Sequence, residues 1–128
     1  MRKTKDEATL VTESIVKGLF EKKGQRVAMI DLRKLENRVC DYFVISHAAS
    51  STQVDSLAWS VEDLVRKETG RKPNHIEGRE NCMWILLDYG DILVHIFQEG
   101  YRDFYNLESL WADGRITVLE DMPEKKGV

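Results

Sequence analysis

Residues 83–97 read MWILLDYGDILVHIF, two apolar runs separated by the residues Asp-Tyr-Gly-Asp. Two alternating runs joined by a two-residue connection that contains glycine are a strong signal for a tight β-hairpin. With Tyr89 and Gly90 as the loop, we expect strands over residues 82–88 and 91–97. The turn then sets the register. The expected cross-strand pairs are Asp88 with Asp91, Leu86 with Leu93, and Trp84 with His95.

The two faces of this hairpin differ in composition, because side chains alternate between them. One face is wholly aliphatic and is predicted to be core: Met83, Ile85, Leu87, Ile92, Val94 and Ile96. The other face mixes apolar and polar side chains: Trp84, Leu86, Asp88, Asp91, Leu93, His95 and Phe97. An aromatic anchor with aliphatic neighbours and an acidic edge is typical of a protein-binding patch whose partner carries Lys or Arg. The alternative is that the C-terminal segment of the same domain covers this face, in whole or in part.

Outside the hairpin, hydrophobic periodicity predicts the remaining elements. Apolar residues at helical spacing predict helices over 6–22 and 51–69, the second capped by Ser50 with Gln53 and ended by Gly70. We expect antiparallel strands at 26–32 and 42–46, a strand at 74–77 parallel to the second, helical structure at 101–111, and an edge strand at 115–119. This order gives the α/β class, with a single mixed β-sheet flanked by helices.

Length and charge limit the classes of function. The chain has 128 residues and a formal net charge of −3. The length predicts one domain spanning residues 1–128, with loose tails at 1–5 and 120–128. A negative net charge argues against binding nucleic acid through overall electrostatic attraction, so no sequence-specific nucleic acid partner is expected. No apolar run is long enough for a membrane span, and the polar N-terminus lacks the apolar stretch of a signal peptide. We therefore expect a cytoplasmic protein with no membrane partner.

Few residues are placed for catalysis or metal binding. The three histidines fall on different predicted elements, and Cys40 and Cys82 lack the spacing of a zinc or redox site. Asp88 and Asp91 flank the turn, so both could approach one cation, although carboxylates at a turn are more often solvated. The phosphate-binding and nucleophile motifs with glycine are absent from the sequence. We therefore predict no cofactor, no metal and no enzymatic activity.

Residues 101–111 form a second candidate patch. If the segment is helical, Arg102, Tyr105, Glu108 and Trp111 recur at a spacing of three and share one side. This side either packs a helix onto the sheet, with one surface ion pair, or takes part in binding.

Several spaced motifs resemble the ribosomal silencing factor family (RsfS, also called Iojap). The similarity covers about residues 27–111. Its main part comprises Trp84, residues 87–91, residues 94–97, Arg102, Phe104, Tyr105, Leu107, Glu108, Leu110 and Trp111. Upstream, residues 40–45, Ser50, Val54 and the pair Glu77 and Gly78 also match. The resemblance implies a nucleotidyltransferase-like topology without the catalytic motif.

The resemblance also implies a function and a partner. Family members bind the large ribosomal subunit through large-subunit ribosomal protein fourteen on its inter-subunit face. They block joining of the small subunit and so repress translation under nutrient limitation, and organellar relatives act in ribosome assembly. The residues expected to bind the partner here are Trp84, Leu86, Asp88, Tyr89, Asp91, Leu93, His95, Arg102 and Tyr105. The alternatives are a metal-dependent nucleotidyltransferase-like enzyme that uses Asp88 and Asp91, and a homodimer built through the same patch.

Overall fold

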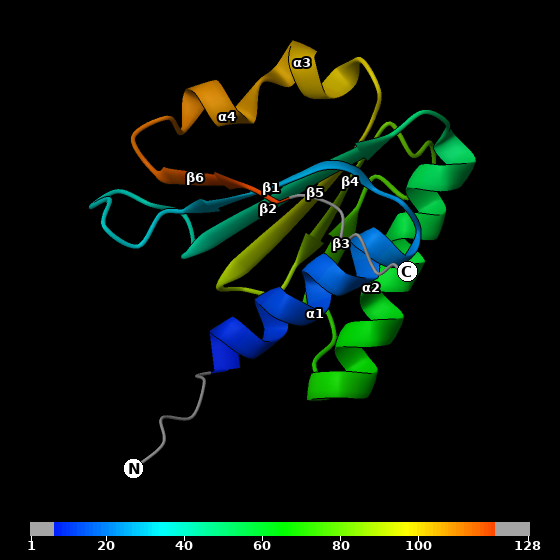
Figure 1. Cartoon of the computed structure of the whole chain (residues 1–128), viewed down its shortest axis with the longest axis horizontal. Coiled ribbons are helices and arrows are strands. Elements are labelled where there is room, and N and C mark those ends of the chain that lie inside the picture. The colour runs from blue at the N-terminus through cyan, green and yellow to red at the C-terminus, as the bar shows by residue number, and fades with distance from the viewer. Residues whose placement is uncertain (1–6, 120–128) are drawn as a thin grey trace, which may run out of the picture.

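A six-stranded mixed sheet lies between two helical layers in this computed structural model, which describes residues 7–119 (Figure 1). The predicted tails at 1–5 and 120–128 lie outside the described residues. Helices α1 (Glu7–Glu21) and α2 (Ser51–Thr69) cover one face, and α3 (Tyr101–Tyr105) and α4 (Leu107–Leu110) cover the other. The strands are β1 (Gln25–Asp31), β2 (Tyr42–Ala48), β3 (His75–Glu77), β4 (Trp84–Asp88), β5 (Ile92–Gln98) and β6 (Arg115–Val118). The predicted α/β class with one mixed sheet is confirmed.

The strand order is β3-β4-β5-β2-β1-β6. As predicted, β1 and β2 are antiparallel, and β6 is an edge strand that pairs with β1. As predicted, β3 runs in the same direction as β2, but it pairs with β4 and is not a neighbour of β2. The parallel neighbour of β2 is β5. Both central strands are almost entirely buried, whereas β3 alternates exposed and half-buried residues and therefore suits an edge.

Helix α2 has both predicted ends. The Ser50 hydroxyl accepts a hydrogen bond from the backbone N–H of Gln53, and Gly70 ends the helix at a φ of 80° with its N–H on the Arg66 carbonyl. The apolar stripe of α2 packs on the sheet together with α1. The two helices cross closely, since a Cβ built on Gly18 would lie 2.9 Å from the Cα of Val61. Among the described helices, none is long and apolar enough to cross a lipid bilayer.

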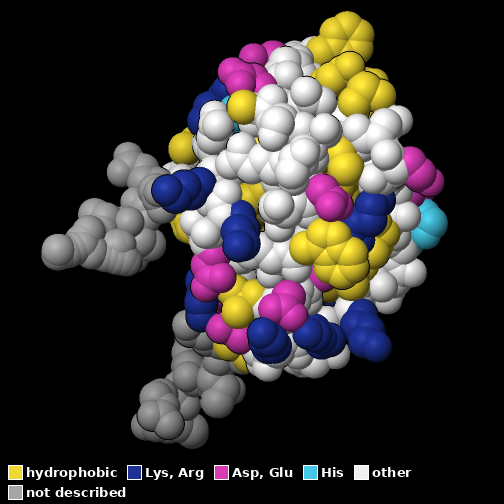
Figure 2. Space-filling model, turned by 90° about the vertical axis from the view of Figure 1, so that its right-hand side faces the viewer, with side chains coloured by type: hydrophobic (Ala, Val, Ile, Leu, Met, Phe, Trp, Pro, Cys, Tyr) yellow, Lys and Arg dark blue, Asp and Glu magenta, His cyan; other side chains and the backbone are white. Residues whose placement is uncertain are grey.

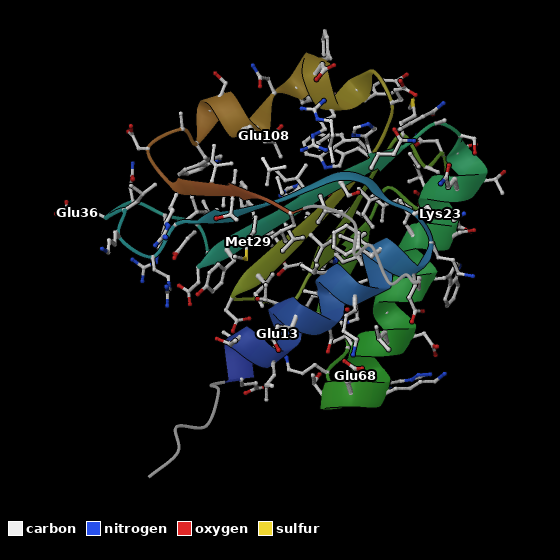
Figure 3. The ribbon with its side chains drawn as sticks, in the orientation of Figure 1. Glu13, Lys23, Met29, Glu36, Glu68 and Glu108 are labelled. Carbon is white, nitrogen blue, oxygen red and sulfur yellow. The ribbon has the colours of Figure 1, made fainter. Side chains whose placement is uncertain are left out.

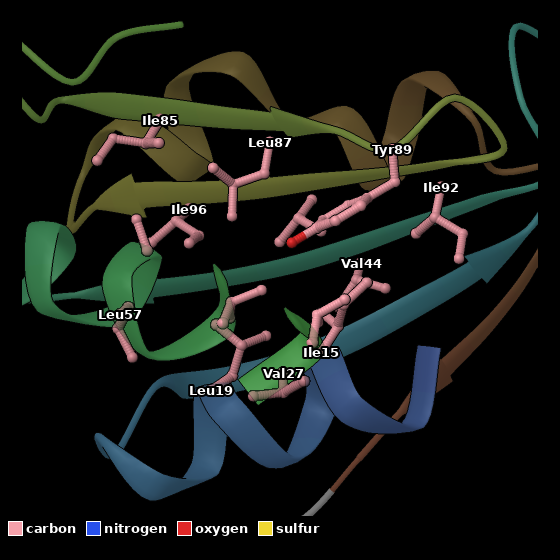
Figure 4. Packing of buried hydrophobic residues seen from close by; sticks show 14 of the residues in the cluster. Ile15, Leu19, Val27, Val44, Leu57, Ile85, Leu87, Tyr89, Ile92 and Ile96 are labelled. Carbon is pink, nitrogen blue, oxygen red and sulfur yellow. The ribbon is translucent and has the colours of Figure 1, made fainter. Parts of the chain in front are cut away.

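Two hydrophobic cores lie on the two sides of the sheet. The larger core joins α1, α2 and one face of the strands, and Figure 4 shows part of it around Ile15, Leu19 and Val44. The smaller core lies under α3 and α4 and contains Ile30, Leu32, Cys40, Phe43, Ile45 and Phe97. The central strands β2 and β5 are therefore buried on both faces of the sheet.

The segment predicted as helical at 101–111 is two short helices instead of one. Asn106 separates α3 from α4 and has a φ of 51°, in the left-handed region. Such a residue ends a helix, and asparagine tolerates this conformation better than most residues. The chain therefore changes direction within the segment, so side chains three residues apart across Asn106 do not share a helix face.

Candidate protein-binding surface

The hairpin has a different register from the predicted one. The observed pairs are Trp84 with Phe97, Leu86 with His95, and Asp88 with Leu93. The backbone N–H of Tyr89 donates to the carbonyl of Ile92 at 2.9 Å, so the two-residue loop is Gly90 and Asp91. Gly90 has a φ of 91°, and a positive φ at the first loop position is what a type II′ turn requires. The predicted pairs Asp88–Asp91, Leu86–Leu93 and Trp84–His95 are therefore wrong, although the division into two faces is unchanged.

Tyr89, expected at the hairpin tip, lies in the larger core instead. The side chain is 1% exposed and points into the cluster of buried side chains, away from Ile92 (Figure 4). Because the loop starts at Gly90, Tyr89 directly follows β4, continues its alternation, and falls on the aliphatic face with Ile85 and Leu87. Burial raises the pKa of its hydroxyl. Tyr89 therefore supports the hairpin from the core side and is not available to a partner.

The opposite face is partly covered by α3 and α4, so the alternative of coverage by the domain's own C-terminal segment is confirmed in part. Phe97 is fully buried and His95 is 5% exposed. Leu93 and Trp84 are half-buried and pack against the smaller core with Leu107 and Trp111. Leu86 and Asp88, whose neighbours on the edge strand β3 are Glu77 and His75, remain partly exposed. The open part of the face therefore runs along β4 beside the edge strand β3.

Trp84 is held in one orientation by its neighbours. Its indole stacks on Phe97 at 4.9 Å between ring centroids and lies 4.6 Å from the ring of Tyr105. The indole N–H donates to Nδ1 of His95 at 3.1 Å. Burial lowers the pKa of His95 to about 4, so the ring is neutral near pH 7 and can accept this bond. The hydrogen-bonded pair therefore fixes the aromatic anchor before any partner arrives.

Arg102 lies beneath the surface, where it attaches α3 and α4 to the sheet. The side chain is 2% exposed. Its guanidinium donates to both carboxylate oxygens of Glu108, at 3.2 and 2.6 Å, and to the carbonyl of Arg26 at 2.7 Å. It also lies 3.0 Å from Nδ1 of His47. The ion pair expected at the surface is therefore largely buried, and Arg102 cannot touch a partner while α3 stays in place.

The bidentate pair also shifts two pKa values. Its hydrogen bonds lower the pKa of Glu108, while burial, followed by the charge of Arg102, lowers the pKa of His47. Figure 3 marks Glu108 on α4, in the layer above the sheet. Tyr105, from the same segment, is 45% exposed and remains available at the surface.

The two aspartates of the hairpin already have partners within the chain. An oxygen of Asp88 accepts a hydrogen bond from the N–H of Gly90 at 2.8 Å. Asp91 lies 3.4 Å from the guanidinium of Arg71. Within residues 7–119, no three side chains of His, Cys, Asp or Glu are grouped closely enough to hold a metal ion. Both aspartates lie at the edge of the open face, where they give it acidic character.

Both cysteines are buried, as expected for structural thiols. Burial raises the pKa of Cys40 to about 11 and also raises that of Cys82. A thiol with a raised pKa is a poor nucleophile at neutral pH.

Sequence reasoning missed two exposed hydrophobic residues in the covering segment. Phe104 is 79% exposed and Leu110 is 72% exposed. Both belong to motifs that carry the family resemblance, and they lie on the two helices that cover the sheet, α3 and α4. Their exposure accompanies the burial of Arg102 in the same segment. A hydropathy pattern does not predict that burial, so the sequence carries no signal for it.

The chain is similar to proteins that act on ribosomes. A family model described as "Ribosomal silencing factor during starvation" matches residues 5–127. A ribosomal silencing factor RsfS from Halalkalibacterium halodurans is 34% identical over 105 residues, which cover 82% of this chain and 88% of that protein. A mouse protein named "Mitochondrial assembly of ribosomal large subunit protein 1" is 28% identical over 79 residues, covering 60% of this chain and 35% of its own.

The fold has solved counterparts as well. A crystal structure of a protein from Chromobacterium violaceum superposes with a TM-score of 0.77 at 31% sequence identity. The superposition covers 84% of this chain and 88% of that one.

Proposed function

Because this chain belongs to the ribosomal silencing factor family, we propose that it binds the large ribosomal subunit through the open face along β4. The contact would be large-subunit ribosomal protein fourteen, on the inter-subunit face. Bound there, the protein would block joining of the small subunit and repress translation when nutrients are limiting. It would act in the cytoplasm as a binding protein and not as an enzyme.

The observation that carries this proposal is the fixed orientation of Trp84. A partly exposed indole, stacked on two rings and hydrogen-bonded to His95, is the kind of rigid anchor that dominates protein interfaces. Leu86 extends the apolar surface, and Asp88 and Asp91 add an acidic edge. This composition suits a basic protein, and it is unfavourable for RNA phosphates.

Ribosome assembly is the second candidate function. The mouse relative is named for assembly of the mitochondrial large subunit, and that role would use the same contact with the subunit. A subunit-joining assay separates the two roles. A silencing factor lowers the yield of joined ribosomes from mature subunits, whereas a pure assembly factor leaves the yield unchanged.

The first experiment is co-sedimentation of the protein with purified large and small subunits in sucrose gradients. We expect the wild type to travel with the large subunit alone. Leu86→Glu should abolish this, because it places a charge in the centre of the open face. Trp84→Glu should do the same, but it also disturbs the stacking on Phe97, so its circular dichroism must be compared with that of the wild type. Trp59→Glu, on the outer face of α2, is the matched control.

Each negative result has a distinct meaning. If wild type sediments with neither subunit, the proposed function is wrong, and calorimetry with Mg²⁺ and nucleotides then tests the enzyme alternative. If Leu86→Glu binds as tightly as wild type, the contact lies elsewhere on the molecule. If light scattering shows a dimer that Leu86→Glu dissociates, the open face joins two copies of this chain.

A further inference from the structure

The segment α3–α4 buries a charged side chain, Arg102, and exposes two large hydrophobic ones, Phe104 and Leu110. Across these two helices the only buried residue is Arg102. Phe104 and Leu110, exposed at 79% and 72%, are the two most exposed large hydrophobic residues of the described chain. A helix that packs on a core ordinarily shows the reverse arrangement. This inversion indicates that the outer side of the segment is itself a contact surface.

The outward hydrophobic side chains continue the open face of the hairpin. Tyr105 lies 4.6 Å from Trp84, and Phe104 lies edge-on to Tyr105 at 5.1 Å between ring centroids. Phe104 also adjoins a shallow hollow of about 350 Å³ that is lined by Glu99, Gly100 and Tyr101. A separate hollow of about 380 Å³ lies beside α2. Figure 2 shows hydrophobic side chains standing out at the upper edge, at the height of α3 in Figure 1. The aromatic row therefore runs without a break from the sheet to the outer side of α3.

The exposed charges that the segment itself carries are acidic. Between residues 99 and 113 the exposed charged side chains are Glu99, Asp103 and Asp113. Arg102, the single basic residue in that stretch, is buried against Glu108. Arg26 of β1 forms a long ion pair with Asp103, at 3.8 Å, and both side chains remain more than half exposed. An apolar row with an acidic rim is complementary to a basic protein surface and repels a phosphate backbone.

We infer that α3–α4 forms the second half of the docking surface, with Phe104 and Leu110 as anchors that enter apolar hollows on a basic protein surface. This inference rests on the proposed function, because its partner is the protein component that the β4 face contacts on the large subunit. It adds two binding residues outside the sheet and a chemical description of the partner. Arg102 is the positioning residue, since its bonds to Glu108 and to the backbone of β1 hold the two short helices in place.

The test is a binding titration of the full chain with purified large subunits, measured by co-sedimentation. The double variant Phe104→Ser with Leu110→Ser removes both anchors and should weaken binding by about tenfold or more. Its melting temperature should match that of the wild type, because both side chains are mostly exposed. The matched control is Trp59→Ser, which removes a 57% exposed hydrophobic side chain from α2, on the other side of the sheet. The control should bind like wild type.

A second variant keeps the test decisive and reports the chemistry of the partner. Asp103 is 80% exposed, so Asp103→Lys reverses a rim charge without disturbing packing. Binding should weaken if the rim meets basic protein groups. Tighter binding by Asp103→Lys would show that the surface faces RNA and would overturn the inference.

The remaining outcomes separate this inference from the function on which it rests. If wild type and the double variant bind equally well, α3–α4 is outside the interface, while the proposed function stands. If wild type fails to bind, both are wrong. If sedimentation velocity shows a wild-type dimer that the double variant dissociates, the occupant is a second copy of this chain, and the inference of a ribosomal partner is overturned.

Discussion

At the scale of single residues, the orientation of Trp84 depends on the protonation of His95. The indole N–H needs an acceptor, and Nδ1 of His95 provides one only while that nitrogen carries no proton. The neutral ring therefore bears its proton on Nε2, which is buried and has no hydrogen-bond partner among the described residues. Burial thus preserves the orientation of Trp84, since an exposed histidine would titrate nearer pH 6.5 and lose this bond in mild acid.

This arrangement predicts a dependence of stability on pH. Because the pKa of His95 falls to about 4 in the folded chain, the unfolded chain binds more protons between pH 4 and pH 6.5, and stability drops as the pH is lowered. A shift from 6.5 to about 4 corresponds to roughly 3 kcal/mol between pH 7 and pH 4. His95→Asn keeps an acceptor near the indole but does not titrate. The difference in free energy of unfolding between wild type and His95→Asn, from urea denaturation, should therefore move against wild type by about that amount.

Carboxylates also titrate in this range, which is why the difference between the two proteins is the informative quantity. A constant difference from pH 7 to pH 4 would mean that His95 is not buried in solution and that Trp84 is free to turn. In that case the fluorescence of the tryptophans should also be insensitive to the substitution.

At the scale of elements, the ion pair between Arg102 and Glu108 helps to attach α3–α4 to the sheet, whereas apolar packing attaches the other helices. Helices α1 and α2 are attached to the sheet by continuous apolar stripes, whereas α3–α4 buries only Arg102 fully and packs Leu107 and Trp111 partly. The bidentate geometry fixes both distance and angle between the two short helices. The placement of this segment on the sheet is therefore as rigid as that pair.

Breaking the pair should loosen α3–α4 selectively. Arg102→Met removes the bonds to Glu108 and to two backbone carbonyls, and Glu108 can still reach water because its side chain is 23% exposed. We expect a loss of about 2–4 kcal/mol in the free energy of unfolding. Hydrogen exchange of the backbone amides should rise most in residues 101–111, while α2 stays protected.

Arg102→Lys is the comparison variant, because it keeps the charge but cannot form the bidentate pair. It should fall between wild type and Arg102→Met in stability. Equal stability of all three proteins would show that the segment is held by Leu107 and Trp111 alone. Uniformly faster exchange across the whole chain would instead place Arg102 in the global core.

The hairpin shows why sequence predicted the faces but not the contacts. Moving the loop from Tyr89 and Gly90 to Gly90 and Asp91 changes every cross-strand pair, yet the faces survive because the side-chain period along a strand is two residues. The same period alone places Tyr89 on the face of Ile85 and Leu87. The preference for a two-residue loop that contains glycine predicted instead that Tyr89 lies in the turn. The antiparallel pairing of β1 with β2, the existence of the hairpin, and helix α2 with its caps were predictable from local patterns, whereas the pairing of β2 with β5 was not.

Other parts of the site follow from long-range contacts that no local pattern encodes. Arg102 and Glu108 are six residues apart, a spacing that brings side chains together only because Asn106 breaks the helix between them. Burial of a charged residue and exposure of Phe104 in the same segment contradict hydropathy. They become predictable only when the docking of the segment on the sheet is known.

At the scale of the whole molecule, the response of binding to salt has two opposing contributions. The chain carries a net charge of −3, so ribosomal RNA repels it at long range, and added salt weakens that repulsion. The acidic rim, comprising Asp88, Asp91 and Asp103, would instead attract basic protein groups at short range, and added salt weakens that attraction as well. The sign of the salt effect therefore reports which contribution controls binding.

If the rim charges meet the partner directly, affinity for the large subunit should fall as salt rises from about 50 to about 300 mM, because the net charge acts beyond the Debye length of roughly 10 Å. Titrations at several salt concentrations measure this slope. Asp103→Asn removes one rim charge without enlarging the side chain, so its slope should be shallower than that of the wild type. Affinity that increases with salt would mean that repulsion by RNA dominates and that the acidic rim is not at the contact. Parallel slopes for the two proteins would place Asp103 outside it.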